Sequence, residues 1–305
     1  MGKARGGFFA FQIEWPTLIL VAGCYATFVI GTVWLAELWL PLGMVVTVVA
    51  LALHSSLSHE VLHGHPFENE LINASLVFPP LGVFVPYLRF KDTHLAHHLD
   101  SQLTDPYDDP ESNYLYAEDW DELSKWQQMM LLTNNTLAGR MVLGPLVGQI
   151  CFMKTDWKDV CAGDRRVLAG WLLHVPAVAL VIAWMTTIGQ MPIWAYILCA
   201  YVALSILKIR TFLEHQAHER ARGRTVIIED RGPLAWIFLN NNLHVVHHMH
   251  PKMPWYRLPG LFQSNRDRYL ARNGGYYFTS YSEVFRKFLW RRKDPVSHPL
   301  WRKGD

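Results

Sequence analysis

Regularly spaced histidines are the residues of this chain with the clearest potential chemistry. They form one His-x-x-x-His cluster and two copies of the pattern His-x-x-His-His. The clusters are His59 and His63; His94, His97 and His98; and His244, His247 and His248. On a helix, residues three or four apart share a face, so each cluster can point several imidazoles at one place. Imidazole binds iron, copper, nickel and zinc, and eight rings exceed what one tetrahedral zinc can use. The spacing therefore predicts a site for two metal ions.

The first cluster by itself also matches the His-Glu-x-x-His motif of zinc metalloproteases, in which Glu60 would act as general base. A protease needs only one further ligand, whereas this chain supplies two more complete clusters. A zinc membrane protease is therefore a distant alternative, and Glu60 is expected to orient a ligand imidazole or to serve the structure. A noncatalytic, histidine-rich metal transporter is another alternative. It would require polar residues along the membrane spans, and these are sparse.

The elements that must position the histidines are strongly apolar. The chain is 51% hydrophobic and holds 13 Trp among its 305 residues, which is rich for a soluble protein. Four apolar stretches have about the 20 residues needed to cross a bilayer. They cover residues 16–36, 38–57, 167–187 and 191–212. Short turns join them in pairs, so we expect an all-α integral membrane protein. It would form a single domain, 1–305, with four transmembrane helices in two hairpins.

Basic residues avoid the two tight turns and collect at the other ends of the spans. They include Lys3, Arg5, Lys154, Lys158, Arg165, Arg166, Lys208, Arg210, Arg220, Arg222 and Arg224. By the positive-inside rule, both termini and the long middle segment lie in the cytoplasm. All histidine clusters then emerge on that side, in a helical cytosolic cap formed by residues 58–166 and 213–305. A bacterial-type inner membrane is the expected location.

Two further apolar segments are expected not to cross the membrane. Residues 71–90 contain three prolines, which break a straight helix, and a crossing there would place the second histidine cluster opposite the first. We interpret them as a re-entrant or interfacial segment. Residues 136–152 are short and contain Arg140, which favours an interfacial helix. No cleavable signal peptide is evident, and the Met1–Gly6 start does not favour myristoylation.

For the charged residues and the cysteines outside the clusters, we prefer roles that do not involve catalysis. The acidic stretch at 107–126 is interpreted as a solvated face. Cations and aromatic residues alternate between Arg286 and Lys303, and in a chain with four spans this pattern favours anionic lipid over nucleic acid. Docking of an acidic electron carrier there is a hypothesis based on charge alone. The four cysteines show no Cys-x-x-Cys pair and are expected to be small buried residues.

The order of the three clusters, with two hydrophobic hairpins interleaved, resembles the membrane fatty acid desaturase superfamily. The resemblance covers roughly Thr47 to Pro259 and includes the residues that follow each cluster. These are Gly64-His65-Pro66, Thr104-Asp105-Pro106 with Asp109-Pro110, and His250-Pro251 with Trp255-Tyr256-Arg257-Leu258-Pro259. The resemblance implies a mushroom-like fold in which four membrane helices lie under a cytosolic cap that holds two iron ions (Fe2+/Fe3+).

The same resemblance implies one extra histidine after the fourth span. His215 is preferred for that position, with His218 as the alternative. The implied ligands are His59, His63, His94, His97, His98, His215, His244, His247 and His248. A tenth position is often a water held by a polar side chain, and Asn240, Asn241 or Asn242 could hold it or simply cap a helix. His65 and His250 are expected near the site or on the surface. His54 and His174, within spans, are expected to be neutral and hydrogen-bonded.

The implied reaction uses O2 and two electrons to remove two hydrogens from a fatty acyl chain or acyl lipid. A hydroxylase or ketolase acting on a lipid or carotenoid is the near alternative. The chain has no Gly-x-Gly-x-x-Gly nucleotide motif and no cysteine cluster, so electrons must come from a ferredoxin-like or cytochrome-like donor with its reductase. A substrate tunnel is expected to use aromatic residues such as Phe78, Phe84, Tyr87 and Trp236, for which core packing is the alternative.

Overall fold

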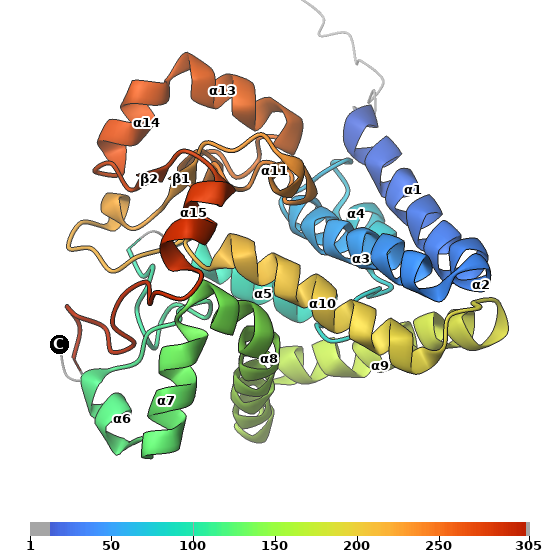
Figure 1. The fold of residues 1–305 in the computed structure, drawn as a ribbon, viewed down its shortest axis with the longest axis horizontal. Coiled ribbons are helices and arrows are strands. Elements are labelled where there is room, and N and C mark those ends of the chain that lie inside the picture. Colours follow the sequence, from blue (N-terminus) through green and yellow to red (C-terminus); the bar gives the residue numbers. More distant parts are fainter. Residues whose placement is uncertain (1–12, 100, 303–305) are drawn as a thin grey trace, which may run out of the picture.

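The computed structural model describes residues 13–99 and 101–302, and these are mostly helical (Figure 1). Four helical segments are long and apolar enough to cross a membrane. They are Trp15–Leu38, Leu40–Leu62, Arg165–Thr187 and Ile193–Thr211. The predicted class is thereby confirmed as a helical protein with four candidate membrane helices and histidine groups that could hold metal. Lys3 and Arg5, which contributed to the predicted orientation, lie outside the described residues, as does the Met1–Gly6 start.

The first hairpin consists of α1 (Trp15–Val29), a π-helical segment η1 (Ile30–Leu35), α2 (Ala36–Leu38) and α3 (Leu40–Leu62). Trp39 is extended and forms the turn, and Pro41 occupies the first turn of α3, where its missing N–H costs nothing. A Cβ on Gly43 would lie 2.6 Å from the Ala36 nitrogen, so only glycine permits this approach of the two segments.

Helix α3 continues five residues beyond the expected end at residue 57. Val61 and Leu62 at its end pack against Val77 and Tyr87 of the cap, and this burial extends the helix past the apolar stretch. His59 therefore lies on the last turns of a membrane helix.

The second hairpin consists of α9 (Arg165–Thr187) and α10 (Ile193–Thr211). The Asp164 side chain caps α9 by accepting the backbone N–H groups of Arg166 and Val167. Small residues of α10 pack into the core between the hairpins, and Cys199 and Ala200 are fully buried there. The backbone N–H of Gln190 donates to the Thr32 carbonyl at 2.8 Å, so the turn of the second hairpin meets the π-helical segment η1 of the first.

The cap lies at the opposite end of both hairpins (Figure 1). Between the hairpins it contains α4 (Glu70–Val77), α5 (Tyr87–His97), α6 (Ala117–Glu122), α7 (Lys125–Asn134) and α8 (Leu137–Cys161). After the second hairpin it contains η2 (Ala221–Gly223), β1 (Ile227–Ile228), α11 (Pro233–Ile237), α12 (His244–Met249), η3 (Trp255–Arg257), α13 (Leu258–Ser264), α14 (Arg266–Arg272), β2 (Tyr277–Phe278) and α15 (Tyr281–Phe288). Strands β1 and β2 pair in parallel, with Ile227 opposite Tyr277.

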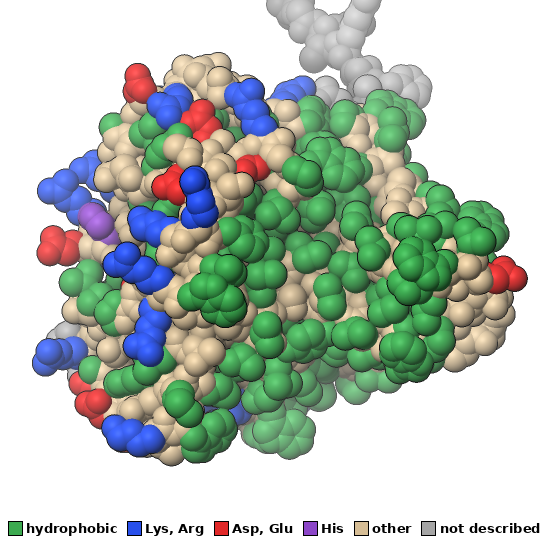
Figure 2. Space-filling model, viewed as in Figure 1, with side chains coloured by type: hydrophobic (Ala, Val, Ile, Leu, Met, Phe, Trp, Pro, Cys, Tyr) green, Lys and Arg blue, Asp and Glu red, His purple; other side chains and the backbone are tan. Residues whose placement is uncertain are grey.

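Hydrophobic side chains cover the part of the surface formed by the spans, whereas charged side chains gather over the cap (Figure 2). Ile19, Trp34, Val45, Leu172 and Leu180 are each more than 60% exposed. A soluble protein rarely exposes such a continuous apolar surface, so this part of the molecule suits a lipid environment.

The two ambiguous apolar segments are not among the four candidate spans. Residues 71–90 form the short α4, a non-helical stretch and the start of α5. Residues 136–152 lie in the longer α8, which exposes Val142, Leu146 and Ile150 along one face. The prediction of buried cysteines was half wrong, because Cys151 and Cys161 on α8 are exposed. Cys151 directly follows Ile150 of this apolar face, and sequence alone does not distinguish such surroundings from a core, whereas Cys161 lies at the exposed end of α8.

A buried ion pair fixes helix α5 against its neighbours. Arg89 donates two hydrogen bonds of 2.9 Å to Asp156, which also accepts the Trp171 indole N–H at 2.8 Å. Replacing Arg89 with alanine would leave the Asp156 carboxylate buried without its cation, and we expect a loss of about 3–5 kcal/mol. The measurement is thermal unfolding in detergent.

Arg166→Ala is the matched control for this prediction. Arg166 pairs with Asp92, but its side chain is 77% exposed, so its removal should cost under about 1 kcal/mol. Equal, small shifts in the two variants would contradict the expected difference.

Candidate metal centre

Four segments bring the histidines together from opposite parts of the sequence. The first cluster lies at the end of α3, the second at the end of α5, and the third in the short helix α12. His215 lies in the loop that follows α10. The structure divides these residues into two groups, and it splits the second and third clusters between them.

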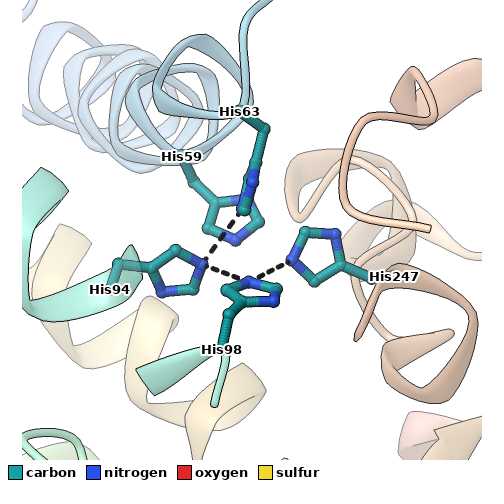
Figure 3. Close-up of side chains that lie close together, drawn as sticks. All are labelled: His59, His63, His94, His98 and His247. Carbon is teal, nitrogen blue, oxygen red and sulfur yellow. Dashed lines mark hydrogen bonds between the residues drawn. The ribbon is translucent and has the colours of Figure 1, made fainter. Parts of the chain in front are cut away.

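The first group contains five histidines from three helices. Its members are His59, His63, His94, His98 and His247, and one ligand nitrogen of each lies within 4.8 Å of all the others. Their rings point toward one centre (Figure 3). The Nε2 atom of His94 lies 3.2 Å from that of His63 and 3.0 Å from that of His98, and the His98 and His247 Nε2 atoms are 3.1 Å apart.

The second group contains the four remaining histidines, His97, His215, His244 and His248. The His215 Nε2 atom lies 2.8 Å from that of His97 and 3.1 Å from that of His244. The groups adjoin each other, because the rings of His98 and His248 stack with centroids 4.3 Å apart. Every residue of the implied ligand set is thus in one of the two groups.

His218 lies outside both groups. It is partly exposed, and its Nδ1 accepts the backbone N–H of Arg220 at 3.0 Å. The structure therefore places His215, and not its alternative, beside the other rings.

Hydrogen bonds on the outer side of the rings indicate which nitrogen carries the proton. The Nδ1 atoms of His94, His97 and His244 lie 2.9, 2.7 and 3.1 Å from oxygens of Glu111, Asp109 and Asn241, respectively. A neutral imidazole has one N–H, so donation from Nδ1 leaves Nε2 with a bare lone pair facing the group. Partners of this kind typically orient metal-binding histidines.

This arrangement fits metal ions better than it fits hydrogen bonds among the rings. Bare nitrogens about 3 Å apart repel each other unless a cation lies between them. Metal–nitrogen bonds of about 2.0–2.1 Å place neighbouring ligand atoms about 2.9–3.4 Å apart. The buried His59 Nε2 also has no hydrogen-bond partner among the described residues. The chemistry of the donor set thus suits borderline or soft divalent ions such as iron or zinc.

The electrostatics favour neutral rings at most positions. Burial, followed by the neighbouring charge of His94, lowers the pKa of His63 to about 2, and burial also lowers the pKa of His98. At His97 burial acts in the same direction, but Glu111 and Asp109 outweigh it and raise the pKa to about 9. An ion in the second group would therefore displace a proton from His97.

The acidic stretch at 107–126 was interpreted as a solvated face, and for two of its residues this was wrong. Asp109 is buried, and it accepts from both His97 and the Thr104 backbone. Glu111 contacts His94. The sequence shows many carboxylates there but does not reveal which of them turn inward. The signal available in the sequence was the Asp109-Pro110 dipeptide, which is one of the features that carry the family resemblance after the second cluster.

The Asn240–Asn242 run was expected to hold a water or cap a helix. The helix α12 has no side-chain cap. Asn241 accepts from His244, whereas the amides of Asn240 and Asn242 donate to the backbone carbonyls of Trp255 and Ile228. These contacts brace the segment that leads into α12.

Glu60 does not face the two histidine groups. It accepts the Trp255 backbone N–H at 2.9 Å and lies near His65, which pairs with Glu14 at 2.8 Å. This geometry argues against Glu60 as the general base of a protease. Other histidines have partners too: His250 contacts Tyr269, His54 contacts Tyr25, and His174 contacts the Val83 carbonyl.

The C-terminal segment folds across the cap instead of lying wholly on its surface. His298 is buried beside Thr104, and the Lys293 amine contacts the His215 carbonyl. Arg286, Lys287, Trp290, Arg291 and Arg292 are exposed, and the contact of this segment with anionic lipid stays a prediction. Sequence reasoning gave His298 no role, because only the tertiary structure shows its partners.

The aromatic residues proposed for a tunnel have mixed surroundings. Phe78 and Tyr87 pack beside Val61 and Leu62, and Phe84 packs against the core between the hairpins. Trp236 is 49% exposed. These contacts favour core packing for the first three.

Four apolar helices below a cap with two adjoining histidine groups define a membrane protein with a candidate two-metal centre. The family model described as fatty acid desaturase matches residues 32–281 of the chain. The chain belongs to the fatty acid desaturase family. No curated protein matches it significantly.

Proposed function

We propose that this protein is an O2-dependent di-iron oxidoreductase that introduces a double bond into a fatty acyl chain or acyl lipid. One observation carries the proposal: nine histidines of a fatty acid desaturase family member form two adjoining groups of five and four, and one ring nitrogen of each lies within 4.8 Å of those of its group. The family is consistent with desaturases and hydroxylases, and the geometry supplies ligands for two ions.

Iron suits the proposed reaction better than zinc does. An unactivated C–H bond is beyond side-chain acids and bases, whereas zinc has no redox chemistry and favours four ligands. Five rings in one group exceed that number. When bound, two irons would supply oxygen activation and share the electrons that it requires.

The residues of this chain would hold, orient and insulate that centre. The five-histidine group would hold one ion and the four-histidine group the other, while Asp109, Glu111 and Asn241 fix the rings through their Nδ1 atoms. The apolar spans would bring the acyl chain from the membrane to the cap. An external ferredoxin-like or cytochrome-like donor would supply electrons at the cap, which the basic residues orient toward the cytoplasm of a bacterial-type inner membrane.

Product mass tests this proposal directly. We would express the protein with an electron donor and its reductase in a host, and compare the lipids with those of a host that makes the His63→Ala variant. Loss of two hydrogens from an acyl chain, only in the presence of O2, is the expected result. Gain of one oxygen would instead establish a hydroxylase, and peptide cleavage without O2 would establish a protease.

A further inference from the structure

A third cluster of potential metal ligands shares no residue with the two histidine groups. It contains Glu14, Glu60 and His65, and one ligand atom of each lies within 4.8 Å of those of the other two. Glu14 directly precedes α1, Glu60 lies in α3, and His65 lies in the loop between α3 and α4. The cluster therefore joins the start of the first span to the end of the second and to the cap.

The two ring nitrogens of His65 have different surroundings. The residue is 4% exposed. Its Nδ1 lies 2.8 Å from Oε2 of Glu14, which can accept its proton. Its Nε2 is buried and has no hydrogen-bond partner among the described residues, although Oε1 of Glu60 lies 3.8 Å away. One side of the ring is thus held, and the other side faces a carboxylate across a gap.

A proton does not fill this gap, whereas a metal ion does. A separation of 3.8 Å is too long for a hydrogen bond, so a proton on Nε2 would be a buried donor without an acceptor. Without that proton, a lone pair would face a negatively charged oxygen. Metal–ligand bonds of about 2.0–2.2 Å allow two ligand atoms of one ion to lie up to about 4.2 Å apart. An ion between His65 and Glu60 therefore fits the observed separation.

The charges of the cluster also favour a cation. Two carboxylates meet one imidazole, and among the described residues neither carboxylate forms an ion pair with a lysine or an arginine. Glu60 is 6% exposed, and buried charges in proteins are usually paired or bind metal. Even a protonated His65 would leave one negative charge of the cluster unbalanced.

The outer contacts of the cluster resemble those of metal sites. Donation from Nδ1 of His65 to Glu14 leaves the Nε2 lone pair directed at the gap, which is the usual arrangement of a carboxylate, a histidine and a metal. Oε1 of Glu60 accepts the Trp255 backbone N–H at 2.9 Å, and this contact fixes the second carboxylate. The Glu14 side chain makes no capping hydrogen bond to α1, so helix capping does not explain its position.

We propose that His65, through Nε2, and Glu60 bind a divalent transition-metal ion of the zinc type at a third site, and that Glu14 orients the His65 ring. Imidazole and carboxylate are donors that zinc accepts in proteins, and water fills the remaining positions. The ion fastens the first span and the end of α3 to the cap. This inference is independent of the proposed di-iron function.

The test measures the zinc bound by iron-loaded, detergent-purified protein after equilibrium dialysis against Zn(II). We expect the wild type to bind one zinc more than His65→Gln and Glu60→Gln, with equal iron in all three. Glu14→Ala, at a side chain that is 27% exposed, should fold normally and bind this zinc about 10- to 100-fold more weakly. Glu68→Ala, at an exposed carboxylate of the same loop as His65, is the matched control and should bind zinc like the wild type.

Thermal unfolding gives a second measurement. An ion that binds only the folded protein raises its unfolding temperature, so zinc should stabilise the wild type and Glu68→Ala but not His65→Gln. Equal amounts of bound zinc in the wild type and His65→Gln would show adventitious binding elsewhere and would overturn the inference. The comparison counts only the zinc that is lost with His65, so a failure of the di-iron proposal would be seen separately, as a lack of bound iron.

Discussion

Replacing His97 with alanine is expected to lower the iron content from about two ions per chain to about one and to abolish oxygen-dependent turnover. His97 belongs to the four-histidine group, which would keep only three rings. His247→Ala removes a ring from the five-histidine group and leaves four, so we expect a smaller loss of iron, although turnover should still fall because both ions share the electrons. Elemental analysis of the detergent-purified variants and oxygen consumption are the measurements.

His250→Ala is the control for this pair. His250 lies two residues after the third cluster, but it contacts Tyr269 and lies outside both groups, so the variant should keep about two irons. One zinc per chain, kept in both His97→Ala and His247→Ala, would show that the later clusters are not ligands. That result would favour the protease alternative over the desaturase proposal.

We also expect the His215→Ala and His218→Ala variants to differ strongly in iron content and in turnover. The two residues are neighbours in one loop, and either could supply the extra ligand by sequence. Only His215 is among the inward-facing rings, with its Nε2 between those of His97 and His244. His215→Ala should lose the ion of the four-histidine group together with turnover, whereas His218→Ala should retain both.

Iron content and the rate of product formation, measured on the two variants in parallel, test this difference. The His218 ring bonds to Arg220 in its own loop, so its loss affects local packing at most. Loss of iron in His218→Ala with full retention in His215→Ala would show that the loop adopts another arrangement in the metal-loaded protein.

The spans and the histidine faces were predictable because they depend on local geometry. Hydrophobic length alone marks a membrane helix, and spacings of three and four place rings on one face of a helix. The pattern could not show where α3 ends, because residues 58–62 remain helical through contacts with the cap.

The residues outside the three clusters that contact the histidines could be identified only from the tertiary structure. Asp109 and Glu111 lie in an acidic stretch whose composition resembles a solvated face. They turn toward His97 and His94 because the chain doubles back after α5, a path that depends on tertiary contacts. The C-terminal segment reaches His215 and Thr104 for the same reason.

The sequence by itself determined the class of this protein: a helical membrane protein of the desaturase type, with enough histidines for two ions. Only the tertiary structure decided how the rings divide, five against four, with the second and third clusters each contributing to both groups. Spacing along a helix sets which rings share a face. Which centre each ring reaches depends on the angles at which α3, α5 and α12 pack, and these angles come from contacts between segments far apart in the chain.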